Sequence, residues 1–595
     1  MEKPLSPVLG GRHSSSMKSP QHCVFQDRAA SKRRWLPWAR QVSKTSVLPL
    51  VLACAVPFAF AQVPAAISPA SILARTKVLA SDEFEGRAPG SPGEEKTVAY
   101  LVREFKRLGL QPGNPDGTYL QDVPLVGITS HSTLSFDING KTVPMASIND
   151  FVGPTSRVSP HVAAKDSDVF FLGYGVIAPE FNWDDFKGVD VGGKTVVMLV
   201  NDPPVNDPQT GQLDPKIFGG KAMTYYGRWT YKYEIAASHG AAACLIVHET
   251  GPAAYPFAVI IGSRSRENFE LRTPDGNRDH LAMEGWLTLE AATRLFAACG
   301  QDFATLKKAA LSRDFKPVPL SAKASFTIDS ELRNVDSKNV VARLPGSDPK
   351  LRDEHVVYTA HWDHLGRNPK LEGDQIYNGA ADNAAGVAVM LELAQAFRAL
   401  PSAQQPKRSI LFLSVTAEEK GLLGSRFYAQ LPLYPLTKTL ANINTDGANP
   451  FGPTSDMATI GFGASTLDDV GTAVAVGQGR TMAPETHPEN GYYYRSDHFE
   501  FAKVGVPAYY AKSGTHFIGK HPDFGEKLIQ DYIAKDYHKV TDEVRPDWTF
   551  EGAAQDTEFL LQVGLRVANG DTWPKWRPGN EFKARRDAMM NSAKQ

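Results

Sequence analysis

The chain has 595 residues, of which 42% are hydrophobic and 22% are charged, and its formal net charge is -1. This length exceeds what one ordinary hydrophobic core holds, so we expect two or three domains. Residues 1–61 carry nine Lys and Arg against two Asp and Glu. The remainder is therefore mildly acidic, which argues against nucleic acid as a partner.

The first 61 residues have the pattern of an export signal. A basic stretch at 32–44 precedes an apolar run at 47–61, which ends in a small-x-small site at Ala61. These three features are typical of a secretory signal peptide, and we expect cleavage near Ala61. A membrane anchor fits less well, because the run is short and contains Pro49 and Pro57. We expect an exported protein, periplasmic or secreted, without stable membrane insertion of the mature chain.

Two other export signals remain open as alternatives. Arg33-Arg34 is a candidate twin-arginine signal, but the Trp-Leu-Pro that follows fits that pattern poorly. Cys54 is a candidate lipoprotein site within an imperfect motif. Cleavage near Ala61 leaves only Cys244 and Cys299, too few for a disulfide framework, and we expect both to be buried as small hydrophobic residues.

Residues 62–134 are predicted to form the N-terminal part of the main domain. Ser91-Pro92 followed by two glutamates provides a cap, a proline in the first turn and acidic residues at the positive end of a helix. Apolar residues recur at helical spacing from Val98 to Leu108, and Gly109 ends the helix.

Between 135 and 330 the sequence changes character. Short apolar runs at 169–174, 195–200 and 242–247 are typical of buried strands, and Gly, Pro and Asp turns separate them. The region has no cluster of chemically active residues, and His239 and His248 stand alone. We interpret it as an inserted accessory domain.

Residues 331–570 alternate between strand and helix patterns, and 571–595 form a tail. Strands are predicted at 356–360, 409–415, 440–444 and 506–510, and helices at 383–399, 422–430 and 550–568. This alternation is typical of an α/β fold, in which helices cover both faces of a sheet. Polar residues at the ends of such strands are the usual place for chemistry.

The first candidate ligand follows the strand at 356–360. His361 comes directly after it, and Asp363 is placed to orient the second ring nitrogen of a metal-bound histidine. A surface polar cluster is the alternative for this His-x-Asp. His364 is predicted to be a spare residue in the pocket wall.

Carboxylates follow at the next two element boundaries. Asp382 precedes a helix, where an ordinary N-cap is the alternative to a carboxylate that bridges two cations. Glu418 and Glu419 follow the most apolar strand of the chain, and Thr416 would make a capping box with Glu419. Adjacent residues point in different directions, so one glutamate can bind metal while the other accepts a proton from water.

Two later residues complete the set. Asp446 follows the strand at 440–444, and His538 lies in a polar loop; each alone is explained by a turn or by surface polarity. Together the candidates offer two imidazoles and three carboxylates at element ends of one domain. That mixture suits a pair of zinc ions and predicts a two-metal hydrolase.

The order of these motifs resembles peptidase family M28, a family of zinc metallopeptidases that includes bacterial leucyl-type aminopeptidases. The resemblance covers about 75–130 and 335–565 and rests on His-x-Asp, Gly-x-x-Asp-Asn-x-x-Gly, Glu-Glu, Asp and a late Tyr-His. It implies a mixed sheet with helices on both faces. The region 135–330 resembles the small, β-rich protease-associated domain inserted in many members.

The resemblance also implies site roles. Two zinc ions per subunit would share Asp382, with His361, Asp382 and Asp446 on one ion and Asp382, Glu419 and His538 on the other. Glu418 would be the general base, and Asp363 would orient His361. Ala381 stands where the family often has a second aspartate, but that position is not a ligand. The segment Ser496-Asp497-His498-Phe499, ahead of Gly505-Val-Pro507, also resembles a family pocket motif, and we expect Asp497, His498 and Arg495 in the substrate pocket.

We therefore expect an exopeptidase that removes N-terminal residues from peptides. Three alternatives stay open: a glutamate-type carboxypeptidase, for which Arg495 or Arg228 would bind carboxylates; a glutaminyl cyclase, which needs a single zinc; and a metal-free binding module. The oligomeric state is left open.

Overall fold

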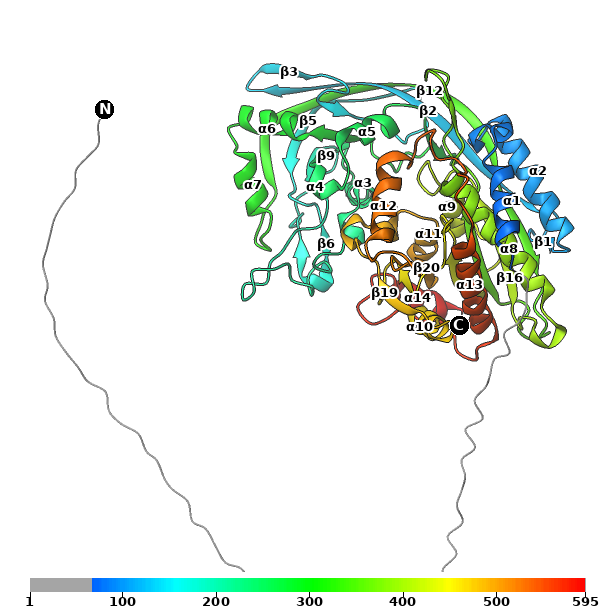
Figure 1. Ribbon diagram of the computed structural model, residues 1–595. Helices are drawn as coiled ribbons and strands as arrows, with labels where there is room; N and C mark the ends of the chain where they lie inside the picture. Colours follow the sequence, from blue (N-terminus) through cyan, green and yellow to red (C-terminus); the bar gives the residue numbers. More distant parts are fainter. Residues whose placement is uncertain (1–66, 594–595) are drawn as a thin grey trace, which may run out of the picture. The chain divides into compact units, whose positions relative to one another are not determined.

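A sixteen-stranded sheet runs through residues 67–593, the part of the chain that the computed structural model describes (Figure 1). The predicted leader, 1–61, lies outside these residues. None of the helices within 67–593 is long and apolar enough to cross a membrane.

The half of the sheet that carries the candidate ligands is mixed. Its strands in spatial order are β19 (Thr481–Pro484), β18 (Asp456–Thr459), β20 (Ala508–Ser513), β17 (Thr439–Asn444), β13 (His355–His361), β16 (Ser409–Val415) and β12 (Val318–Leu344). β13 pairs in parallel with β16 and β17, whereas β12 runs antiparallel to β16. The mixed α/β sheet is therefore confirmed.

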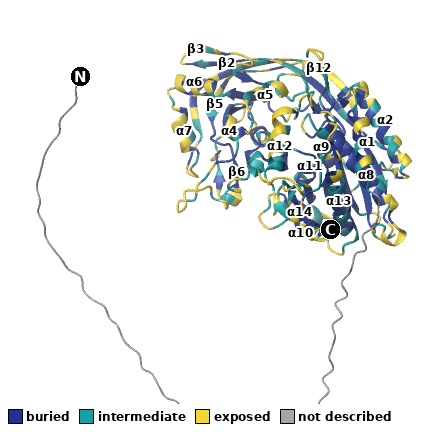
Figure 2. Ribbon diagram, viewed as in Figure 1, coloured by how far each residue is buried: buried dark blue, intermediate teal, exposed yellow. Residues whose placement is uncertain are grey.

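Helices cover both faces of this half. On one face, a large apolar cluster joins the sheet to α1 (Pro69–Leu79), α2 (Pro92–Arg107), α8 (Ala385–Ala399), α10 (Leu467–Gly477) and α13 (Glu551–Asn569). On the other face, a second cluster joins Val357 and Leu411 to Tyr428 of α9 (Leu423–Gln430) and Phe501 of α11 (His498–Lys503). α8 and α13 are mostly buried (Figure 2). The C-terminal region adds α12 (Phe524–Lys535) and α14 (Lys583–Ser592).

The region 135–330 extends the same sheet. Its strands are β3 (Lys141–Met145), β4 (Phe151–Val152), β5 (His161–Phe171), β8 (Thr195–Leu199), β9 (Ala243–His248), β10 (Asn268–Leu271) and β11 (Met283–Thr288). Its helices are α3 (Trp229–Ser238), α4 (Thr250–Ala253), α5 (Phe257–Arg264), α6 (Leu289–Ala298) and α7 (Phe303–Ala309). These elements enclose two apolar clusters distinct from those of the ligand-bearing half.

Two long strands connect the halves. β2 (Leu120–Ile138) pairs antiparallel with β12 from Leu120↔Val340 to Asp137↔Lys323, and the pair forms the upper edge of the view in Figure 1. Residues 135 and 330 thus lie inside continuous strands. The shorter strands are β1 (Gln111–Pro112), the hairpin of β6 (Ile177–Ala178) and β7 (Trp183–Asp184), and the hairpin of β14 (Gly366–Arg367) and β15 (Ile376–Tyr377).

Local sequence signals explain several of these elements. Ser91 caps α2, because its hydroxyl accepts a hydrogen bond from the Glu94 amide, and Gly109 follows the helix at a φ of 72°. β16 occupies the predicted range 409–415 and is buried at every position, as expected for a central strand covered on both faces. Cys244 and Cys299 are free and buried, as expected.

Candidate metal centre

The candidate ligands lie where three neighbouring parallel strands end. His361 is the last residue of β13 and is paired with Val415, the last residue of β16. Asp446 follows β17, whose final residue Asn444 pairs with Thr359. Because the carboxyl ends of parallel strands meet at one edge, residues far apart in the sequence converge there.

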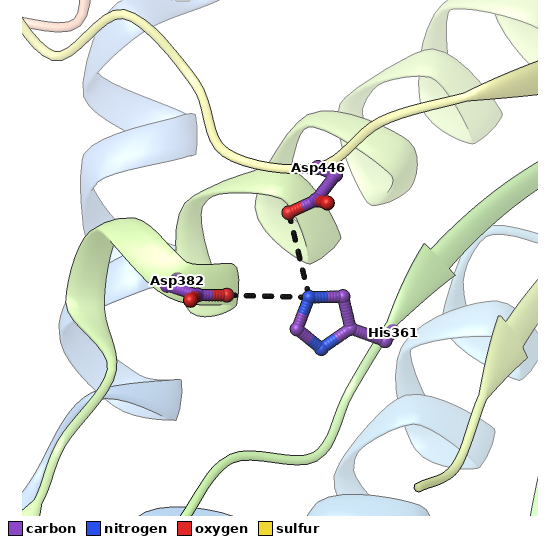
Figure 3. A group of neighbouring side chains, drawn as sticks. All are labelled: His361, Asp382 and Asp446. Carbon is purple, nitrogen blue, oxygen red and sulfur yellow. Dashed lines mark ion pairs between the residues drawn. The ribbon is translucent and has the colours of Figure 1, made fainter. Parts of the chain in front are cut away.

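His361, Asp382 and Asp446 form the first group (Figure 3). The Nε2 atom of His361 lies 3.3 Å from Oδ1 of Asp382 and 3.4 Å from Oδ1 of Asp446. The histidine is 1% exposed. One ligand atom from each residue falls within the 4.8 Å spread of a metal-binding group.

A second group forms around the other oxygen of Asp382. The Nε2 atom of His538 lies 3.4 Å from Oδ2 of Asp382 and 3.1 Å from Oε2 of Glu419. Asp382 therefore directs one oxygen to each histidine, which is the arrangement that a bridging carboxylate requires. All five predicted ligands come together.

The spacing of these donor atoms fits zinc. Nitrogen and oxygen ligands at about 2.0–2.2 Å from a tetrahedral zinc lie roughly 3.3–3.6 Å from each other. The four contacts above range from 3.1 to 3.4 Å. Imidazole and carboxylate donors are also the types that zinc accepts. The residues present thus fit the ion that the sequence predicts.

His364 plays a part that the sequence did not reveal. It is fully buried, and its Nδ1 lies 2.6 Å from Oε1 of Glu419, a hydrogen-bond distance. It also belongs to a second metal-binding group with Asp382 and Glu419. The predicted place in the pocket wall is wrong, because the side chain contacts Glu419 and does not line the cavity.

Glu418 and Asp363 occupy the same edge. The carboxylate of Asp363 accepts hydrogen bonds from the amides of Glu418 at 3.0 Å and Glu419 at 3.4 Å. His361 Nδ1 is 3.1 Å from the backbone carbonyl of Asp363 and 3.8 Å from its carboxylate. Asp363 therefore contacts His361 through its main chain and the glutamate pair through its side chain.

Burial dominates the electrostatics of these carboxylates. It raises the pKa of Glu418 well above its ordinary value, and the charge of His361 opposes that rise. Burial also raises the pKa of Asp363 to about 6, again against the effect of His361. Loss of solvent disfavours the charged form of a carboxyl group, and a nearby cation restores it.

Three buried residues hold the ligand loops in place. Asp542 accepts hydrogen bonds from the amides of Ala381 at 2.9 Å and Asp382 at 3.1 Å. Asn383 accepts from the Gly447 amide at 2.8 Å, next to Asp446.

The third residue, Arg87, donates to the carbonyls of Trp362, Asn378 and Gly379. These contacts clamp the loop after His361 to the loop before Asp382. Asp542 lies four residues after the candidate ligand His538 in the sequence, whereas no local signal marked Arg87.

The predicted pocket residues require a correction. Arg495 lines the cavity beside the metal centre, but Asp497 and His498 do not. Both are 0% exposed, and the His498 ring packs against Tyr493 and Tyr510 at centroid distances of 4.7 and 5.0 Å. Asp497 immediately precedes α11, and His498 is the first residue of that helix.

The cavity has a volume of about 2270 Å³. Its lining includes Glu418, Asp446 and His538, together with Trp229 and Tyr255 of the region 135–330. Small-molecule pockets usually measure about 300–1,000 Å³. The cavity is larger than that range.

Fold and site together define an α/β protein with a candidate two-metal centre at the carboxyl ends of parallel strands. Residues 339–561 match the family model described as peptidase family M28. Over this segment the chain matches a family whose listed relatives include zinc metalloproteases, and the resemblance inferred from the motifs is confirmed there. The assignment of 135–330 as a protease-associated domain stays a prediction.

Relatives share short stretches of sequence with the chain. A "Probable zinc metalloprotease" of Pyrenophora teres f. teres is 38% identical over 113 residues, 19% of this chain and 23% of that protein. "Aminopeptidase YwaD" of Bacillus subtilis is 35% identical over 115 residues, 19% and 22% of the two chains. The chain thus spans less than a quarter of the length of these curated relatives.

Solved structures are similar over more of the chain. The aminopeptidase from Aneurinibacillus sp. strain AM-1 aligns with a TM-score of 0.44 and 18% identity, over 86% of this chain and 95% of that one. The zinc aminopeptidase BSAP from Bacillus subtilis aligns with a TM-score of 0.39 and 16% identity, over 87% and 97%.

Proposed function

We propose that this protein is a two-zinc aminopeptidase that hydrolyses the N-terminal peptide bond of peptides. The observation that carries the proposal is the position of Asp382, with one oxygen 3.3 Å from His361 and the other 3.4 Å from His538. A shared carboxylate between two His–carboxylate groups is the arrangement of a two-metal hydrolase. Export to the periplasm or the medium belongs to the proposal as well.

The ligand sets are those expected from the motifs: His361, Asp382 and Asp446 for one ion, and Asp382, Glu419 and His538 for the other. When bound there, zinc lowers the pKa of a water molecule towards about 7 and polarises a carbonyl group. Glu418, which faces the cavity, accepts the proton of the attacking water and passes it to the leaving amine.

The other site residues position these groups. The Asp363 carboxylate holds the backbone of Glu418 and Glu419, so the base and the ligand keep different directions. His364 orients Glu419 by its hydrogen bond to Oε1, which leaves Oε2 facing His538. Preorganised groups of this kind do not need to reorient during the reaction.

Selectivity for a free N-terminus is supported by the name of the relative "Aminopeptidase YwaD". A free amine placed at the metal centre aligns the first peptide bond with the attacking water, so that binding of the peptide also orients the reacting atoms. An acetylated peptide lacks that anchor. We therefore expect it to react far more slowly than the free peptide.

One experiment tests the function. Bound metal is measured on the purified protein, and product release is followed with free peptides, N-acetylated peptides and peptides with acidic C-terminal residues. Two zinc ions and release from the free N-terminus are expected. Equal kcat/KM for free and acetylated peptides, or release from the C-terminus, would defeat the aminopeptidase assignment in favour of a carboxypeptidase. Absence of both metal and turnover would favour a binding module.

A further inference from the structure

Two arginines of the cavity wall have no counterion among the described residues. Arg228 precedes α3 and is 8% exposed, and Arg495 follows the short helix η8 (Tyr492–Tyr494). Both line the cavity that contains Glu418. Nε of Arg228 and both Nε and Nη2 of Arg495 are buried and have no hydrogen-bond partner within residues 67–593.

Other arginines of the same cavity are paired. Arg264 lies 3.3 Å from Glu284, Arg333 lies 2.9 Å from Glu267, and Arg426 contacts Glu270. Pairing is therefore common among the arginines of this wall, and neither Arg228 nor Arg495 forms an ion pair with a described residue.

Aromatic rings surround the two guanidinium groups. Arg495 lies 5.9 Å from the ring centre of Tyr255 and 5.6 Å from that of Tyr492, and Arg228 lies 5.9 Å from that of Trp229. Such faces attract a cation but accept no hydrogen bond along the edge of the guanidinium plane. The donor edges remain available to an anion.

The charges of Arg228 and Arg495 are unfavourable in this wall without an anion. Burial lowers the pKa of Arg228 to about 10, and the nearby charge of Arg495 lowers it further in the same direction. Two like charges held in a desolvated wall destabilise each other unless an anion joins them. A carboxylate offers two oxygens that match the fork of a guanidinium group.

Contacts between the two halves of the protein fix the positions of the two arginines relative to each other. Near Arg228, the ring of Tyr225 packs 6.0 Å from Tyr494 and 5.1 Å from Phe499. Lys503 forms an ion pair with Glu234 of α3 at 2.8 Å. The two cations therefore come from different halves but belong to one wall.

We propose that Arg228 and Arg495 bind a carboxylate group of the peptide substrate while the metal centre acts on the bond to be cleaved. The proposal rests on the proposed function and adds a substrate class, peptides that carry an anionic group away from the reacting end. Two sources share this chemistry, the C-terminal carboxylate of a short peptide and an acidic side chain.

Matched peptide pairs test the proposal. One pair is Leu-Ala-Ala as the free acid and as the C-terminal amide; the other is Leu-Glu-Ala amide and Leu-Gln-Ala amide. For the zinc-loaded wild type we expect the KM of the carboxylate member to be about 10- to 100-fold lower in at least one pair. Which pair shows the difference identifies the source of the carboxylate.

Variants assign the preference to the two arginines. In Arg228→Met, Arg495→Met and the double variant, the KM difference between the carboxylate and the neutral member should disappear. Arg333→Met, which removes a cavity arginine already paired with Glu267, should keep the preference. Arg228→Lys and Arg495→Lys keep the positive charge but lack the forked donors of the guanidinium group, so they should lose part of the preference for the carboxylate member. These lysine variants provide the test if a Met variant does not fold.

Failure of the subsite and failure of the function have different signatures. Equal KM values within both pairs for the wild type, or a preference that persists in the double variant, would overturn the subsite although neutral peptides are still cleaved. If no peptide is cleaved, calorimetry of zinc-loaded Glu418→Gln with the same pairs measures the preference as a Kd ratio. A ratio near one would then overturn the subsite independently.

Discussion

At the scale of single residues, the neighbours of Glu418 and Glu419 support different proposed roles for them, general base for Glu418 and metal ligand for Glu419. Both glutamates line the cavity, and Glu419 lies 3.1 Å from His538 and 2.6 Å from His364, contacts that the Glu418 side chain does not make with these two histidines. Both amides are held by the carboxylate of Asp363. The adjacent glutamates therefore point to different partners.

Glu418→Gln should keep the zinc and lose most of its turnover. Glutamine has nearly the same shape but cannot accept the proton, and removal of a general base typically costs about 10²–10⁴-fold in kcat. Zinc content by metal analysis and kcat on a neutral peptide check this. Glu419→Gln is the control and should lose zinc; the two roles are exchanged if Glu418→Gln loses the metal and Glu419→Gln keeps it.

Asp542→Ala should weaken zinc binding although Asp542 is not a predicted ligand. The substitution leaves the amides of Ala381 and Asp382 without their acceptor, so the bridging carboxylate loses its support. Loss of such a supporting contact typically lowers metal affinity about 10–100-fold. Competition with a chelator measures the change. The exposed Asp523→Ala serves as control, and equal affinities in both variants would contradict the role of Asp542.

At the scale of elements, α8 connects the ligand loop to the N-terminal helices. Glu392 of α8 is 1% exposed, pairs with Arg75 of α1 and accepts a hydrogen bond from the Ser68 amide at 2.9 Å. Arg75 also donates to Gln395 at 2.8 Å. The pair thus fixes α1 against the helix that begins just after Asp382.

Glu392→Leu should lower the free energy of unfolding by about 3–5 kcal/mol, because it leaves the buried charge of Arg75 without a partner. The double variant Arg75→Leu with Glu392→Leu should recover much of that loss, since two apolar side chains need no counterion. Denaturant unfolding measures both. Arg107→Ala breaks an exposed pair with Glu104 and should change stability by less than about 1 kcal/mol. If Glu392→Leu were as stable as the double variant, the result would contradict the expected cost of leaving Arg75 buried without its partner.

At the scale of the whole molecule, the region 135–330 shares its sheet with the rest of the protein. β10 pairs with β2, and its residues Phe269 and Leu271 join an apolar cluster with Ala417 and Leu423. That cluster flanks Glu418 and Glu419. All five predicted ligands lie outside 135–330, but the region supports the loop that carries two of the site residues.

Replacing residues 131–329 by an Asn-Gly turn joins Ser130 to Ser330, which are paired in the sheet. We expect the shortened protein to keep its zinc and to lose stability by several kcal/mol, because the side chains that Phe269 and Leu271 cover become exposed. It should also lose any carboxylate preference together with Arg228. Metal analysis and thermal unfolding check this. Loss of zinc from a folded variant would contradict the prediction that the metal centre does not need residues 131–329.

Much of the ligand-bearing fold follows from local patterns. The helix predicted at 422–430 is α9 at Leu423–Gln430, and β16 fills its predicted range, because apolar periodicity and strand ends are encoded within a few residues. His361, Glu419 and Asp446 were recognisable because they follow predicted strands, whereas Asp382 precedes a predicted helix and His538 lies in a polar loop. β12 was not predicted as one strand: its 27 residues alternate between buried and exposed positions, and its partners lie up to about two hundred residues away.

The sequence by itself determined the class of fold, the ligand types and their positions at strand ends, because those features depend on neighbours along the chain. Only the tertiary structure decided which side chains meet. His364 reaches Glu419 across 55 positions, Asp542 reaches the Asp382 amide across 160, and Arg87 reaches Trp362 across 275. Such contacts are made by packing between elements, so no local pattern of residues encodes them.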